Sequence, residues 1–144
     1  MTTFTNIWNQ IVNHIVAIIS LAVAVTALGY TTWREEATEK NRNLREASFE
    51  VLKHLGELQI VINYGHYEPD NTMGNPILGW GHIAIIGDLG QILPPPIPEK
   101  TAKLTQVWTD NWQDIKTDEK AVDNISKEVD ESRDAVLDEI RKLR

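Results

Sequence analysis

The fold of this chain is decided by its most apolar stretch, which reads IVAIISLAVAVTALGY from Ile15 to Tyr30. No Asp, Glu, Lys or Arg occurs anywhere in residues 1–33. A helix that crosses a lipid bilayer needs about 20 mostly apolar residues, each adding ~1.5 Å of length. The segment 11–32 meets that requirement, and its flanks carry aromatic residues of the kind that lie at lipid headgroups, namely Trp8, Tyr30 and Trp33. The sequence therefore predicts one transmembrane helix.

Two other interpretations of this segment are open. A cleaved signal peptide has a positively charged leader and a small-x-small cleavage site. Ala22-Val23-Ala24 has the composition of such a site, but the leader before it contains no Lys or Arg. A buried core helix of this length would need a large surrounding domain, for which the remaining chain is too short. A retained span is therefore the interpretation that the residues favour.

All charged side chains follow the apolar segment, where 14 basic and 21 acidic residues give a formal net charge of −7. An acidic domain without a basic stripe is repelled by phosphate backbones, so we expect no nucleic-acid partner. The chain has no cysteine. This excludes a disulfide framework, a thiolate metal site and a cysteine nucleophile.

The distribution of basic residues predicts an orientation in the membrane. None precedes the span, whereas several follow it within about 20 residues, the window in which such residues set topology: Arg34, Lys40, Arg42, Arg45 and Lys53. Basic residues are retained on the cytoplasmic side, and acidic ones count little. We therefore expect the N-terminus outside and the bulk of the chain in the cytoplasm.

The residues after the span read as helices joined by short loops. A seam of apolar residues at alternating spacings of three and four predicts that the span continues as a helix to about Asn63: Leu44, Ala47, Val51, Leu55, Leu58 and Ile62. Turn-forming residues predict a loop over 64–74. Asn75-Pro76 then suits the start of a Gly-rich helix over 77–93, with Asn as the N-cap. A β-strand over 82–86 is an alternative, but no second strand is available to pair with it.

Two more helices are predicted beyond the proline-rich connector at 94–98. The first carries Leu104, Trp108, Trp112 and Ile115 on one face. The second follows an N-cap at 117–119 and has an apolar repeat from Val122 to Leu143. Because helices joined by short loops pack antiparallel, the predicted fold is all-α. It consists of a transmembrane segment at 1–33 continuing into a small antiparallel helical bundle at 34–144.

No catalytic, cofactor-binding or metal-binding set of residues can be recognised. Glu50 precedes His54 by four residues and Glu57 follows it by three, and no second such pair occurs. Bundles that bind metals use repeated Glu-x-x-His motifs with further carboxylates, so we predict no metal site and, for lack of ligands, no haem. The serines lack a nucleophile elbow, and no phosphate-binding glycine loop is present.

Two groups of residues are candidates for contacts with a partner or ligand. Aromatic and polar side chains gather around the 64–82 loop and could line a binding surface: Tyr64, His66, Tyr67, Trp80 and His82. The competing explanation is that these rings only cap the end of the bundle. In the span, polar and small residues at one-turn spacing would let another helix approach closely: Asn9, Asn13, Ser20 and Ala24.

These features predict a non-enzymatic, single-pass membrane protein that acts as a scaffold or accessory subunit of a membrane complex. Its expected partners are the lipid bilayer and either another membrane protein or a second copy of itself. The alternative function is a ligand-sensing helical bundle outside the cytoplasm, with its pocket at the 64–82 loop.

Overall fold

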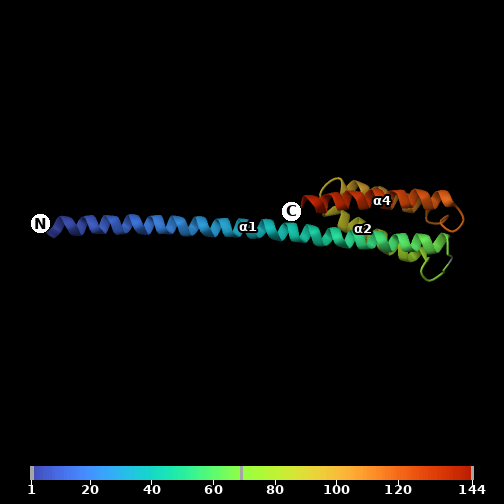
Figure 1. The fold of residues 1–144 in the computed structure, drawn as a ribbon, viewed down its shortest axis with the longest axis horizontal. Coiled ribbons are helices and arrows are strands. Elements are labelled where there is room, and N and C mark those ends of the chain that lie inside the picture. Colours follow the sequence, from blue (N-terminus) through green and yellow to red (C-terminus); the bar gives the residue numbers. More distant parts are fainter. Residues whose placement is uncertain (1, 69, 144) are drawn as a thin grey trace. The chain divides into compact units, whose positions relative to one another are not determined.

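The computed structural model describes the backbone of residues 2–68 and 70–143, and the side chains of residues 14–68 and 70–143. These residues form four helices, which are α1 (Thr2–His66), α2 (Pro76–Gln91), α3 (Ile97–Asn111) and α4 (Glu119–Lys142) (Figure 1). No described residue lies in a strand, so the alternative strand at 82–86 is wrong and the all-α prediction is confirmed. The chain divides into two compact units, Met1–Lys40 and Asn41–Arg144.

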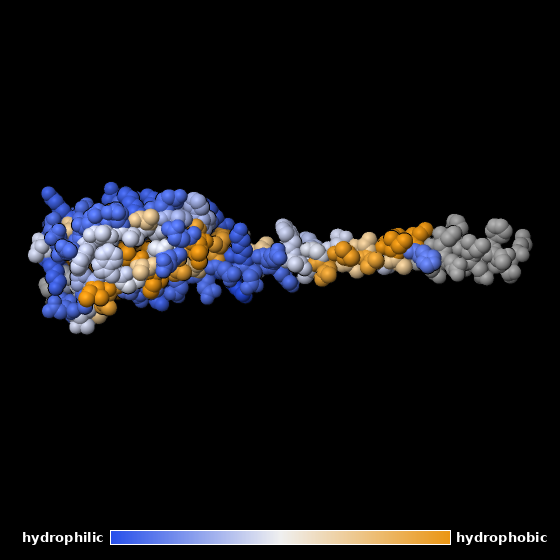
Figure 2. Space-filling view, turned by 180° about the vertical axis from the view of Figure 1, so that it is seen from behind, coloured by the Kyte–Doolittle hydropathy of each residue, from blue (hydrophilic) through white to orange (hydrophobic). Residues whose placement is uncertain are grey.

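The first unit is the N-terminal part of α1. From His14 on, α1 is the one helix in the described part of the chain that is long and apolar enough to cross a membrane. None of its apolar window is buried, and apolar side chains run along the face of this segment seen in Figure 2. Its large aliphatic side chains, from Ile15 to Leu28, are 51–69% exposed. The hydroxyl of Thr26 donates to the carbonyl of Ala22 at 2.8 Å, which satisfies this polar group within the helix.

The second unit is an antiparallel four-helix bundle built from the C-terminal part of α1 and from α2 to α4. The last part of α1 and α4 lie side by side in Figure 1. The Arg45 guanidinium donates to the carbonyl of Leu143, and the Gln59 amide donates to the Ser126 hydroxyl at 3.2 Å. Residue numbers therefore rise along α1 as they fall along α4, so these two helices run in opposite directions.

The remaining helix pairs are antiparallel as well. Between α3 and α4, Lys100 lies 2.7 Å from Glu131 and Lys103 lies 2.7 Å from Glu128. Between α1 and α2, the ring nitrogens of His54 and His82 approach to 3.1 Å, and Gly74, just before α2, lies against Gly65 near the end of α1. Between α2 and α3, Gly79 lies against Trp108 and Gly90 against Thr101. Each helix thus contacts its neighbours in the chain, and α4 closes the bundle against α1.

The apolar seam of α1 lies inside this bundle, as its spacing predicted. Four of its side chains are fully buried, namely Val51, Leu55, Leu58 and Ile62, and Ala47 is 7% exposed. They pack with buried residues of the other helices, namely Ile83, Ile86, Ile97, Leu104, Trp108, Ile125, Val129 and Val136. The seam of α1 is therefore covered by the other helices of the same chain.

Two glycines of α2 allow close packing against α3. A Cβ atom on Gly79 would lie 2.3 Å from the ring of Trp108, and one on Gly90 would lie 2.3 Å from the Thr101 hydroxyl. Gly81, by contrast, has nothing within 4 Å of the corresponding position. The glycines of α2 thus lower its helix propensity. At Gly79 and Gly90, which lie on the same side of α2 about three turns apart, they let α3 approach closely.

The predicted helix ends differ from the structure by a few residues. Helix α1 extends to His66 rather than Asn63, because the chain keeps its helical hydrogen bonding into the expected loop. The N-caps are confirmed: the Asn75 side chain accepts from the N–H of Ile77 at 3.0 Å, and Asp118 accepts from the N–H of Lys120 at 2.9 Å.

Candidate functional site

The five residues that the sequence grouped around the 64–82 loop do not form one site in the structure. His66 Nδ1 donates to the carbonyl of Ile115 at 2.7 Å, since a carbonyl oxygen can only accept. The His66 ring also packs edge-on against Tyr67, with centroids 4.6 Å apart. These contacts tie the end of α1 to the segment between α3 and α4, as expected for side chains that cap a bundle.

Trp80 belongs to an aromatic cluster with α3. Its ring meets Trp108 and Trp112 edge-on, with centroids 6.2 Å apart in both pairs. Such T-shaped contacts are favourable because the positive edge of one ring faces the negative face of the other. Trp80 therefore helps to join α2 to α3.

Tyr64 and Tyr67 line a shallow hollow together with Asn63 and Glu68. Asp70 stabilises the adjoining loop. Its carboxylate accepts hydrogen bonds from the backbone N–H of Thr72 at 2.6 Å and from that of Met73 at 3.2 Å. These hydrogen bonds hold the pKa of Asp70 below its ordinary value. Of the predicted contact residues, the two tyrosines are the pair that shares one surface hollow.

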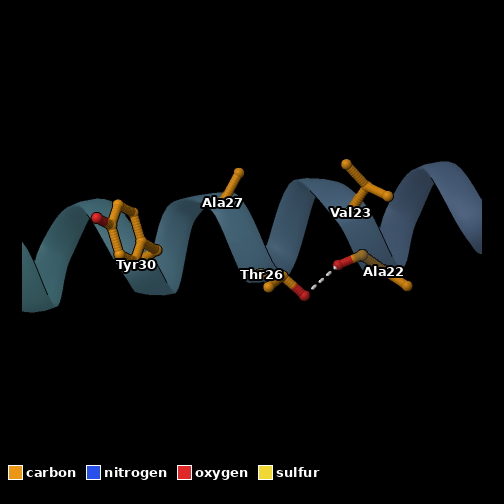
Figure 3. Close-up of a pocket in the computed structure, with 5 residues that line it drawn as sticks. All are labelled: Ala22, Val23, Thr26, Ala27 and Tyr30. Carbon is orange, nitrogen blue, oxygen red and sulfur yellow. Dashed lines mark hydrogen bonds between the residues drawn. The ribbon is translucent and has the colours of Figure 1, made fainter.

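A second shallow hollow lies on the candidate span, along the face of α1 shown in Figure 3. Its lining consists of Ala22, Val23, Thr26, Ala27 and Tyr30. Asn9 and Asn13, which the sequence also proposed for helix association, lie outside the residues whose side chains are described. Ser20 and Ala24 are exposed.

His82 lies in a different place from the rest of the predicted group, in a cluster with His54 and Glu57. The Glu57 carboxylate oxygen Oε2 is 3.0 Å from His54 Nδ1 and 3.3 Å from His82 Nδ1. The two Nδ1 atoms are themselves 3.1 Å apart. Three potential ligand atoms from α1 and α2 therefore converge on one point.

The cluster is partly shielded from water. The side chains of His54, His82 and Glu57 are 14%, 22% and 39% exposed. Burial lowers the pKa of His82; the Glu57 carboxylate opposes this effect, and the His54 ring adds to it. The His82 ring is therefore held in its neutral form at neutral pH, in which one ring nitrogen has a free lone pair.

Two of the three members of this cluster could be recognised from the sequence. His54 and Glu57 are three residues apart and share one face of α1, a spacing that suggests metal ligands, although the sequence predicted no metal site. His82 was grouped with the loop surface instead, because a separation of 28 residues contains no local signal of proximity. Only the register between α1 and α2 reveals the third member.

Comparisons with known proteins add no functional information on these residues. The sequence matches no protein-family model, and searches of curated proteins and of solved structures found no significant match.

Proposed function

We propose that this protein is a non-enzymatic, single-pass membrane-anchored scaffold or accessory subunit. The observation that carries the proposal is the contrast between the two units. The bundle buries its own apolar seam, whereas the aliphatic side chains of α1 from Ile15 to Leu28 are 51–69% exposed. Moving each such side chain from water into an apolar environment is favourable by about 1.5–3 kcal/mol. The free energy of this segment is therefore much lower in lipid than in water.

The serine environments support a non-enzymatic role. The hydroxyls of Ser48 and Ser132 are buried and have no hydrogen-bond partner among the described residues, so no described base activates them as nucleophiles. The Ser126 hydroxyl accepts from the Gln59 amide. Ser20 lies in the proposed span.

The basic residues that follow the span favour a cytoplasmic bundle. On this proposal the N-terminus lies outside, and the scaffold presents its four-helix bundle on the cytoplasmic side. A reporter enzyme fused to the C-terminus and active in one compartment only would test the orientation. A cytoplasmic signal supports the proposal.

The second candidate function is ligand sensing outside the cytoplasm, favoured by the hollow that Tyr64 and Tyr67 line with Asn63 and Glu68. An extracytoplasmic signal from the same reporter would favour this function over the scaffold. Replacing Tyr64 with Ala should then abolish ligand responses while leaving membrane attachment unchanged.

Membrane attachment is tested by ultracentrifugation of a lysate prepared without detergent. We expect the intact chain to sediment with the membranes, to resist alkaline carbonate and to be released by detergent, because the apolar segment lies in the bilayer. A version beginning after Trp33 is the control and should stay in the supernatant. Intact chain in the supernatant would contradict the proposal.

Self-association is proposed to use the side of the span that carries Ser20 and Ala24. At about 100° per residue, this pair points roughly away from Ala22 and Thr26. The Thr26 hydroxyl already donates a hydrogen bond within its own helix, whereas the Ser20 hydroxyl makes no hydrogen bond in the described part of the chain. A hydroxyl in lipid that lacks a partner favours pairing with another helix.

Replacing Ser20 and Ala24 with Leu should therefore weaken self-association at least tenfold, because the larger side chains keep the helices apart. Molar mass in detergent, measured by light scattering over a range of protein concentrations, checks this expectation. Replacing Ala22 and Thr26 with Leu adds similar bulk to the other side and should leave the mass unchanged. Equal masses for the wild type and the first variant would exclude this side as the interface.

A further inference from the structure

The cluster of His54, Glu57 and His82 has the donor atoms and the spacing of a metal-binding site. Two imidazole nitrogens and one carboxylate oxygen are ligands typical of zinc and related divalent transition metals. They come from two helices, α1 and α2, that are packed together within one compact unit. The packing of the bundle therefore holds the three ligand atoms in place.

The distances fit one ion. Two ligands at ~2.05 Å from a tetrahedral zinc ion lie about 3.3 Å from each other. In the cluster, the three separations between ligand atoms are 3.0, 3.1 and 3.3 Å. The three atoms therefore form a nearly regular triangle, which matches one face of such a tetrahedron.

Hydrogen bonds alone satisfy this triangle poorly. Each neutral imidazole carries one N–H, and the Glu57 carboxylate carries none. Two protons at most are therefore available for three short contacts. If both Nδ1 atoms donate to Glu57, the two N–H groups face each other across 3.1 Å. A cation at the centre interacts favourably with all three ligand atoms at once.

The surroundings also suit a metal ion. The other ring nitrogen of His54, Nε2, lies 3.9 Å from the Glu50 carboxylate, and metal-bound histidines commonly direct their second nitrogen to a carboxylate. Glu57 is 39% exposed, which leaves a side of the cluster open to water as a fourth ligand.

We propose that His54, Glu57 and His82 bind one divalent transition-metal ion, with zinc as the best fit. His54 and His82 bind through Nδ1 and Glu57 through Oε2, and the Glu50 carboxylate adds negative charge on the far side of the His54 ring. The ion links α1 to α2 and so stabilises the bundle. This inference goes beyond the proposed scaffold function and does not depend on it, because metal binding and membrane attachment are measured separately.

The test is a zinc titration of the full chain in detergent after removal of metals with a chelator. We expect one zinc ion per chain by isothermal titration calorimetry. Replacing His82 with Ala or Glu57 with Gln should weaken binding at least tenfold, and replacing Glu50 with Gln should weaken it less than either, because its carboxylate lies 3.9 Å from His54 Nε2. Replacing Glu46, an exposed residue one turn before Glu50, with Gln should leave the affinity unchanged.

Cobalt provides a readout of geometry. Co²⁺ bound by two nitrogens, one oxygen and water in a tetrahedral site should show intense visible absorption, which the His82→Ala chain should lack. Circular dichroism establishes that each variant is folded, and the isosteric Glu57→Gln chain keeps the test valid if His82→Ala unfolds. Absence of zinc binding by the wild type at millimolar zinc, or equal affinity in wild type and both variants, would overturn the proposal.

Discussion

Replacing Trp108 with Ala should lower the free energy of unfolding of the bundle by about 3–5 kcal/mol, the usual cost of removing a large aromatic side chain from a core. Trp108 is fully buried, and its ring contacts Trp80 of α2 edge-on. The same ring occupies the space above Gly79. Its loss would leave a cavity between α2 and α3 that the remaining side chains cannot fill.

Urea unfolding of the full chain in detergent, followed by circular dichroism, measures this effect. Trp33 is the matched control because it is 66% exposed and belongs to the first unit. Its replacement with Ala should not change the unfolding of the bundle. A Trp108→Phe chain should lose less than Trp108→Ala, since it keeps an aromatic ring and removes an indole N–H that has no hydrogen-bond partner in the part of the chain that the structure describes. Equal losses for Trp108→Ala and Trp33→Ala would contradict the packing described above.

Replacing Gly79 with Ala should destabilise the bundle by about 1–3 kcal/mol, although Ala normally favours a helix. The added methyl group would lie 2.3 Å from the Trp108 ring, which forces the ring or the helix to move. Gly81 is two residues away on the same helix and has open space at this position. The Gly81→Ala chain should gain up to about 1 kcal/mol from helix propensity.

The same unfolding experiment compares the two glycine variants. The clash also predicts coupling: in a Trp108→Ala background, Gly79→Ala should lose most of its cost, because the ring that it meets is absent. A cost that stays the same in both backgrounds would mean that Gly79 acts through something other than Trp108. Stabilisation by Gly79→Ala in the wild type would show that the close contact does not exist.

Much of the fold could be predicted because its signals are local. The spacing of Val51, Leu55 and Leu58 on α1 predicted which face is buried, and those residues form the core. Asn75 and Asp118 were recognised as N-caps because the cap hydrogen bond joins residues two apart in the chain. The continuation of the apolar helix into the bundle also followed from the absence of a helix breaker between Trp33 and Asn63.

The candidate site could not be predicted to the same extent. The sequence grouped His82 with Tyr64, His66, Tyr67 and Trp80 because they are close in the chain. The bundle gives three of them different partners: His66 contacts Ile115, Trp80 contacts Trp108, and His82 contacts His54 and Glu57. Proximity along a chain predicts proximity in space only within a turn or two of helix.

Local signals in the sequence were enough to predict the helices, their buried faces and a segment apolar enough to cross a membrane. These properties follow from periodicity, capping and composition, which act over a few residues. Which side chains of different helices meet became known only from the folded bundle. The register between α1 and α2 brings His82 to His54 and Glu57, and the close approach of α3 to Gly79 depends on packing between helices. Such contacts arise from the fit of whole surfaces, for which a single sequence carries no local signal.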